Sequence, residues 1–106
     1  MAIIILPDAQ EDLLSLQDYM LDQWGESAWG LAEDEIFEKL HLIETGFVDG
    51  SPIPELAAVG ITIYKNAYTS HHQLVYQRLD GKTYLYLAAG HRQDYTNILL
   101  KRLLRR

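Results

Sequence analysis

The feature that most limits the possible folds is a change of hydrophobic pattern halfway along the chain. Residues 8–44 repeat their apolar side chains with the period of an α-helix, whereas residues 60–89 carry short strand-like segments around a turn. A chain of 106 residues can enclose one hydrophobic core, so both patterns must share it. These observations predict a single α+β domain over residues 1–106.

Two helices are predicted in the first half. Asp8 and Glu11 have the spacing of a capping box, and Gly25 marks the end of the first helix. A second helix over residues 27–44 repeats small and aliphatic residues on one face. We expect an antiparallel hairpin with carboxylates outward and with both tryptophans, Trp24 and Trp29, packed. The apolar faces comprise Leu13, Leu16, Met20 and Trp24, and then Ala28, Ala32, Ile36, Leu40 and Ile43.

A strand and a loop are predicted on either side of this hairpin. Residues 2–6 are an apolar run that ends at Pro7, which suits a short strand. Residues 46–60 contain three glycines and two prolines, so the helical period is lost there. We therefore expect a loop between the helical half and the strands that follow.

Three strands and a short helix are predicted to complete the fold. Asp80 and Gly81 form a hairpin turn, because both tolerate the positive φ angles of such turns. Asp94 can cap a final helix that is basic at its C-terminal end. The strands are expected over residues 60–65, 72–78 and 83–89.

The last strand has two distinct faces in this prediction. Leu85, Leu87 and Ala89 alternate with Tyr84, Tyr86 and Ala88, so the first set is expected to face the helices. The complete prediction is an N-terminal strand, an antiparallel helical hairpin, a three-stranded antiparallel meander and a short C-terminal helix.

The charged residues are divided unevenly. Residues 1–55 contain 13 acidic side chains and one lysine, whereas residues 56–106 contain two acidic side chains and eight lysines or arginines. The net charge of the chain is -6. Such a division is typical of a protein that binds an anionic partner through one half. The alternative is that the two halves attract each other within the fold and keep the protein soluble.

The lack of cysteine and of a targeting segment bears on where in the cell the protein is expected. The chain has no cysteine, which excludes disulfides and thiolate metal sites. Residues 2–6 are too short for a signal peptide or a membrane span and lack a basic flank. We expect a cytoplasmic protein with no membrane partner.

Two groups of motifs follow one another along nearly the whole chain. The first is Pro-Asp-Ala-Gln-Glu-Asp-Leu at 7–13, followed by Tyr19 and by Trp-Gly at 24–25. The second is Leu-Val-Tyr-Gln at 74–77, a hairpin turn, and an apolar strand leading into Gly-His-Arg at 90–92. Together they resemble the RelE/ParE superfamily of bacterial toxins, closest to its ParE branch. The resemblance implies the toxin of a type II toxin-antitoxin system, in a hetero-oligomer with a cognate antitoxin.

The resemblance implies one of two activities. ParE-like toxins inhibit DNA gyrase or a related topoisomerase by binding, which requires no catalytic group and no cofactor. RelE-like toxins are mRNA endoribonucleases that act on the ribosome. The ParE reading favours a binding inhibitor over an enzyme. A non-toxic adaptor that binds a peptide is the second alternative.

The positions of the cations favour the ParE reading. Arg92 matches the arginine of the family's glycine-x-arginine element, and it could bind a phosphate or pair with Asp94. The arginine that ribonuclease members carry before Leu-Val-Tyr is replaced by Gln73. Only Lys65 remains of the lysines expected on the preceding strand.

The histidines are the other candidates for catalysis. His71 and His72 precede one strand and His91 follows another, so they could converge at one end of the sheet as an acid and a base. Neighbouring residues on a strand point to opposite faces, so at most one of His71 and His72 is expected to face a given site. No third ligand at a suitable spacing indicates a metal site.

A binding surface for the target or the antitoxin is predicted in the basic half. Tyrosines and arginines are enriched where proteins bind one another. The alternative for the tyrosines is a packing layer beneath the final helix. The candidate residues are Arg78, Arg92, Tyr76, Tyr84, Tyr86 and Lys82.

Overall fold

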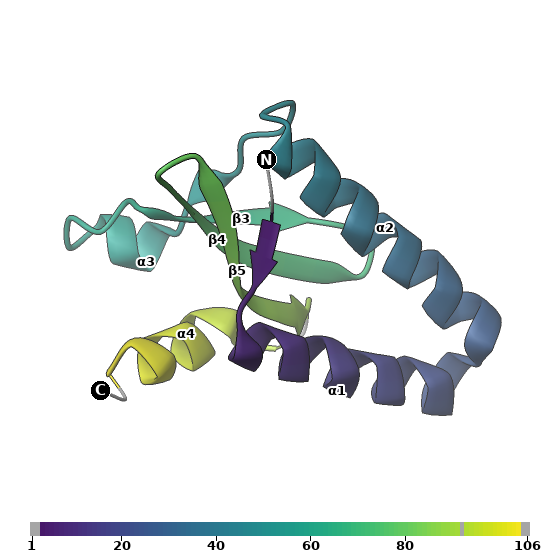
Figure 1. Ribbon diagram of the computed structural model, residues 1–106. Helices are drawn as coiled ribbons and strands as arrows, with labels where there is room; N and C mark the ends of the chain where they lie inside the picture. The colour runs from purple at the N-terminus through teal and green to yellow at the C-terminus, as the bar shows by residue number, and fades with distance from the viewer. Residues whose placement is uncertain (1–2, 92, 105–106) are drawn as a thin grey trace.

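The computed structural model describes residues 3–91 and 93–104, and within them it forms one mixed sheet with helices on both faces (Figure 1). The strand order is β1-β5-β4-β3-β2. The fold is α+β, as the sequence predicts. The elements are β1 (Ile3–Ile5), α1 (Pro7–Trp24), α2 (Glu26–Glu44), β2 (Ser51–Pro52), α3 (Pro54–Ala57), β3 (Tyr64–Tyr68), β4 (His72–Leu79), β5 (Lys82–Gly90) and α4 (Tyr95–Leu104).

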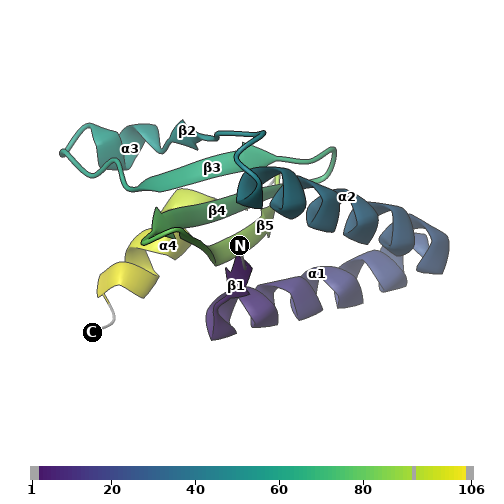
Figure 2. The same ribbon diagram turned by 45° about the horizontal axis from the view of Figure 1, so that its top comes forward.

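The sheet pairs the first strand of the chain with the last. β1 pairs in parallel with β5, with Ile3 opposite Thr83 and Ile5 opposite Leu85. The predicted meander is present as β3, β4 and β5, which pair antiparallel in sequence order. β1 therefore lies at one edge of the sheet, beside the strand that leads toward α4 (Figure 2).

α1 begins two residues earlier than the predicted cap at Asp8 implies. Pro7 occupies the first turn and Leu6 is the N-cap residue, with no side-chain hydrogen bond at the cap. The predicted capping box of Asp8 and Glu11 is therefore wrong. Proline suits the first helical position because its φ angle is already helical and its missing N–H has no partner there. Asp8 instead lies with a carboxylate oxygen 4.0 Å from Nε of Arg102.

A single residue, Gly25, connects α1 to α2. Its φ angle of 90° suits glycine, and its N–H donates to the carbonyls of Met20 and Leu21. The two helices diverge from this corner, and the C-terminal part of α1 runs beyond the end of the sheet (Figure 1). The predicted stop at Gly25 is confirmed.

The apolar faces of the helices are largely as predicted, with one exception. Trp29, Ala32, Ile36, Leu40 and Ile43 are buried along α2. Leu16 and Met20 are buried on α1. Trp24, however, is 68% exposed, so the expectation that it packs is wrong. It is the last residue of α1, where the helix has passed the end of the sheet.

The segment predicted as a loop contains two short elements. β2 pairs with β3, and α3 follows directly. The next predicted strand is displaced, because β3 begins at Tyr64 and runs to Tyr68. Ile61 and Ile63 are exposed in the connection before it. The bounds of β3 are set by its pairing with β4, which places Tyr64 opposite Gln77. The local apolar pattern does not set them.

The hairpin between β4 and β5 closes as predicted but contains an irregularity. Asp80 and Gly81 have φ angles of 53° and 76°. The register shifts between Val75 and Tyr76, which are opposite Leu87 and Leu85 respectively. Tyr86 is thus an extra residue on β5, and a strand that gains one residue exchanges its two faces.

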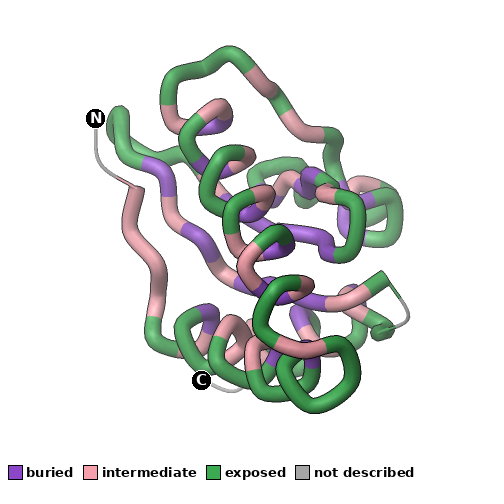
Figure 3. Tube along the Cα trace, turned by 90° about the vertical axis from the view of Figure 1, so that its right-hand side faces the viewer, coloured by how far each residue is buried: buried purple, intermediate pink, exposed green. Residues whose placement is uncertain are grey.

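This irregularity corrects the predicted facing of β5. Leu85 and Ala88 pack in the cluster beneath α1 and α2, whereas Leu87 and Ala89 pack with Leu99 of α4. The prediction that both leucines face the helical hairpin is therefore wrong. The buried residues form separate clusters on the two faces of the sheet, and burial follows the strands and the inner sides of the helices (Figure 3).

The last helix is capped as predicted. Asp94 precedes α4, and its Oδ1 accepts a hydrogen bond from the backbone N–H of Asn97 at 3.2 Å. Within the residues that the structure describes, no helix is long and apolar enough to cross a membrane.

Candidate functional site

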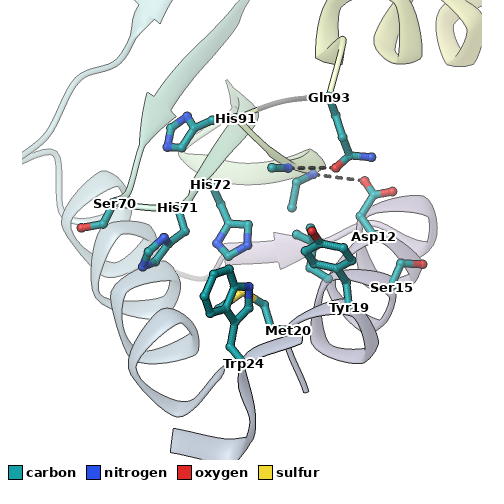
Figure 4. A pocket seen from close by; sticks show the side chains of 13 residues that line it. Asp12, Ser15, Tyr19, Met20, Trp24, Ser70, His71, His72, His91 and Gln93 are labelled. Carbon is teal, nitrogen blue, oxygen red and sulfur yellow. Dashed lines mark hydrogen bonds between the residues drawn. The ribbon is translucent and has the colours of Figure 1, made fainter. Parts of the chain in front are cut away.

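A pocket of about 680 Å³ lies between the C-terminal half of α1 and the end of the sheet where β4 begins and β5 ends. We call it the histidine pocket, because His71, His72 and His91 all line it (Figure 4). α1 contributes apolar and aromatic side chains to the opposite wall, among them Met20 and Trp24. The prediction that the three histidines converge at one end of the sheet is confirmed.

His72 is the buried member of this group. It is the first residue of β4 and only 2% exposed, and its Nδ1 has no hydrogen-bond partner. Burial lowers the pKa of His72, and the nearby His71 and His91 add to this shift, which Glu35 opposes. His72 therefore favours its neutral form.

The exposed histidines are held by the turn between β3 and β4. His71 precedes the first residue of β4, so the alternation of side chains along a strand does not apply to it, and both His71 and His72 reach the pocket. The rings of His71 and His72 are 6.2 Å apart. Nε2 of His91 lies 3.1 Å from the carbonyl oxygen of Thr69. The ring of His91 also stacks on Tyr68 with centroids 5.8 Å apart.

This turn is anchored to α2. The backbone N–H of Ser70 donates to a carboxylate oxygen of Glu35 at 2.9 Å. That hydrogen bond is the main reason why the pKa of Glu35 is lowered. Thr69 closes the turn, since its hydroxyl accepts from the N–H of His72 at 3.0 Å. The tertiary contact and the local turn together fix where His71 lies.

Asp12 borders the pocket but is fully engaged elsewhere. Its two oxygens accept hydrogen bonds of 2.8 and 2.6 Å from the guanidinium of Arg102. One of them also accepts from the N–H of Ala88 at 3.1 Å. Arg102 donates in addition to the carbonyl of Tyr86 at 2.9 Å. We call this arrangement the Arg102 latch, because it joins α4 to α1 and β5.

The latch was not predicted. The sequence predicts only that the last helix is basic at its C-terminal end. The hydrogen bonds to Asp12 raise the pKa of Arg102. Both side chains are less than one-fifth exposed. The two residues are 90 positions apart, so no local pattern could reveal their pairing.

The predicted surface role of Tyr76 is corrected by its burial. Tyr76 is 0% exposed, and its hydroxyl accepts a 2.6 Å hydrogen bond from the N–H of Gly50. A Cβ on Gly50 would lie 2.3 Å from the carbonyl oxygen of Asn66, so glycine is required at this contact. Tyr76 packs with Ile43 and Ala67 beneath α2 and is not free to contact a partner.

Tyr84 and Tyr86 are half-buried. The Tyr86 hydroxyl donates to Oε1 of Gln77 at 2.9 Å, and its ring meets Tyr64 edge to face at 5.1 Å. Tyr86 also packs against the cluster that contains Leu99 of α4. For Tyr86 the structure therefore matches the alternative interpretation, a packing layer beneath the final helix.

The predicted basic residues have different environments. Arg78 donates to the backbone carbonyls of Ile43, at the end of α2, and of Val48. Lys82 is exposed at the beginning of β5. Arg92 lies outside the described residues. Arg78 thus contributes to the fold by satisfying carbonyls near the C-terminus of a helix.

Two further positions relate to the ribonuclease alternative. Gln73 is 5% exposed, and its Oε1 has no hydrogen-bond partner. Lys65 forms an ion pair with Asp49 at 2.9 Å. The hydrogen bond from Lys65, followed by the attraction of its charge, is the main reason why the pKa of Asp49 is lowered. In the part of the chain that the structure describes, no group of three or more potential ligand side chains could hold a metal ion.

Comparisons with known proteins give one family match and one similar fold. The family model described as the ParE toxin of the type II toxin-antitoxin system parDE matches residues 3–95. The fold is similar to a chain of the structure titled "Chromosomal ParDE TA system from P. aeruginosa", with a TM-score of 0.68 and 12% sequence identity. That similarity covers 85% of this chain and 95% of the other. No curated protein sequence matches. The chain belongs to the ParE toxin family of type II toxin-antitoxin systems.

Proposed function

We propose that the protein inhibits DNA gyrase or a related topoisomerase in the cytoplasm, and that a cognate antitoxin neutralises it by binding. The observation that carries the proposal is the match to the ParE toxin family over residues 3–95. That match covers the helical hairpin and the complete sheet. Inhibition by binding requires a surface that contacts the target and no catalytic group on the toxin.

The environments of the cations support binding over RNA cleavage. An mRNA endoribonuclease needs exposed cations to hold phosphates. Lys65 is paired with Asp49, and Arg78 donates to carbonyls near the end of α2. Gln73, at the position where ribonuclease members carry an arginine, is neutral and buried. Lys82, half-buried Tyr84 and Arg92 remain the candidate residues for the target surface.

An exposed sheet edge supports the antitoxin as a partner. β1 is the edge strand beside β5, and its three isoleucines are only partly buried. An extended segment can add to such an edge through backbone hydrogen bonds, while alternate side chains determine specificity. We therefore expect the antitoxin to cover β1 in the neutralised complex.

The proposal is tested by inducing the protein alone in bacteria. We expect growth arrest with double-strand breaks and intact mRNA, and co-expression of the protein encoded by the adjacent gene should restore growth. The Arg92→Ala variant should lose toxicity, whereas His41→Ala, whose side chain is 70% exposed on α2, should keep it.

Other outcomes identify the alternatives. Cleaved mRNA without DNA breaks would overturn gyrase inhibition in favour of the ribonuclease. Normal growth at high expression would favour the non-toxic peptide-binding adaptor. Full toxicity of Arg92→Ala would remove Arg92 from the proposed surface.

A further inference from the structure

The histidine pocket has features that the proposed function does not use. It joins an apolar wall on α1 to a wall of imidazoles at the end of the sheet (Figure 4). Its size, about 680 Å³, is within the range of pockets that bind small organic molecules. We propose that the histidine pocket binds an organic carboxylate, with its apolar part against α1 and its carboxylate against His71, His72 and His91.

The strongest sign of a ligand is the unsatisfied nitrogen of His72. The side chain is almost completely buried, and Nδ1 has no partner. Leaving a buried polar atom unpaired costs about 1–3 kcal/mol, so such atoms usually have a partner. His72 points into the pocket, between Met20 and Trp24 on one side and the remaining histidines on the other (Figure 4). His72 is thus the buried polar side chain of the pocket wall that a bound carboxylate would approach.

The charges around the pocket select an anion over a cation. Asp12 is the one carboxylate among the described residues that line the pocket. Both of its oxygens are already bound to Arg102, and one also accepts from Ala88. A cationic ligand would therefore meet no free counterion, whereas imidazoles can supply N–H donors to an anion.

Among the described residues, the lining of the pocket favours a carboxylate over a phosphate. Phosphate sites commonly use arginine or lysine, because a phosphate carries more charge than a carboxylate. The described lining residues include neither. Histidines with nearby hydroxyl groups, Ser70 among them, suit a singly charged group better.

The wall formed by α1 accounts for the organic part of the ligand. Leu16 and Met20 form the buried portion of this wall, and Tyr19 and Trp24 stand at 59% and 68% exposure beside it. Aromatic side chains that are this exposed have a large apolar area still available for a ligand. A hydrocarbon or aromatic group would cover them while its carboxylate reaches His72.

Binding should be linked to protonation. The charged groups that act on His72 are His71 from the turn, His91 after β5 and Glu35 from α2. A carboxylate favours protonated imidazole because opposite charges attract. Because the pKa of His72 is lowered, its protonation lies below about pH 6.5, and the affinity should rise as the pH falls below that value.

The test uses the purified full-length chain and 3-phenylpropionate as the probe, with neutral 3-phenylpropanamide as the matched control. Binding is followed by tryptophan fluorescence and by the imidazole signals in NMR spectra. We expect the acid to bind, the amide to bind at least about tenfold more weakly, and the imidazole signals of His72 to shift. Equal binding of acid and amide, or an affinity that does not change with pH, would overturn the proposal.

Variants locate the site. His72→Gln should weaken binding of the acid about tenfold, and the double variant of the two exposed residues, His71→Gln with His91→Gln, should do the same without disturbing the core. His41→Gln is the control, because His41 is an exposed histidine on α2 outside the pocket. An equal loss in His41→Gln, or full binding in the double variant, would contradict the assignment.

The carboxylate could belong to a small organic acid or to the C-terminus of a polypeptide. A short peptide that ends in phenylalanine, compared with its C-terminally amidated form, separates these sources. A polypeptide ligand is supported if the peptide with the free carboxylate binds more tightly than 3-phenylpropionate and the amidated peptide does not bind. Binding of 3-phenylpropionate without the peptide supports a small organic acid.

Discussion

The Arg102 latch and the histidine pocket share a border at Asp12 but differ in how well their polar groups are paired. In the latch, Asp12 and Arg102 form two short hydrogen bonds and are further bonded to the backbone of β5. In the pocket, Nδ1 of buried His72 has no partner. Complete pairing is typical of a contact that maintains the fold, whereas buried polar groups without a partner are rare in folded proteins.

The largest change in stability is expected when the apolar contact that supports the latch is removed. Leu99 of α4 is 0% exposed in the cluster beneath that helix. Leu99→Ala should lower the free energy of unfolding by about 3 kcal/mol, because it removes buried apolar atoms and leaves a cavity. Urea unfolding measures this loss. Leu104→Ala, at a site 81% exposed on the same helix, is the matched control and should change stability by less than about 0.5 kcal/mol.

A smaller loss of stability is expected when the ionic part of the latch is removed. Arg102→Ala leaves the carboxylate of Asp12 without its main partner and should cost about 2 kcal/mol. Arg102→Lys should recover only part of this loss, because lysine cannot form the two parallel hydrogen bonds. Amide hydrogen exchange should show faster opening of α4 in both variants.

The exposed ion pair of Lys65 and Asp49 provides the comparison for the latch. The side chains of this pair are 34% and 63% exposed, so solvent screens their attraction. Lys65→Ala should destabilise the protein much less than Arg102→Ala. Equal losses in the two variants would show that the latch contributes no more than a surface pair.

The smallest expected effect concerns the pH dependence of stability at the pocket. The pKa of His72 is lowered by burial, so the unfolded chain takes up this proton more readily than the native protein. The contribution of His72 is therefore complete above about pH 6.5 and is lost as the pH falls toward the lower native pKa. Denaturant midpoints are measured between about pH 5 and pH 8. As the pH is lowered, they should fall more steeply for the unsubstituted protein than for His72→Gln. His41→Gln should keep the steep fall.

Local patterns predicted most of the secondary structure. The apolar repeat of α2, the stop at Gly25, the turn at Asp80 and Gly81, and the cap at Asp94 all depend on residues within a few positions of one another. The convergence of the histidines was also predictable, because His72 and His91 lie at the ends of neighbouring antiparallel strands. The proline in the first turn of α1 was the local signal that the capping-box interpretation overlooked.

The sequence by itself thus determined the two long helices, the last helix, the hairpin turn and the family, since helical period, turn φ angles and motif order are short-range properties. Only the tertiary structure decided the exchange of faces at Tyr86, the burial of Tyr76, the exposure of Trp24 and the pairing of Arg102 with Asp12. The reason is physical. Strand register and contacts between distant residues depend on how whole elements pack, and a shift of one residue reverses which side chains are buried.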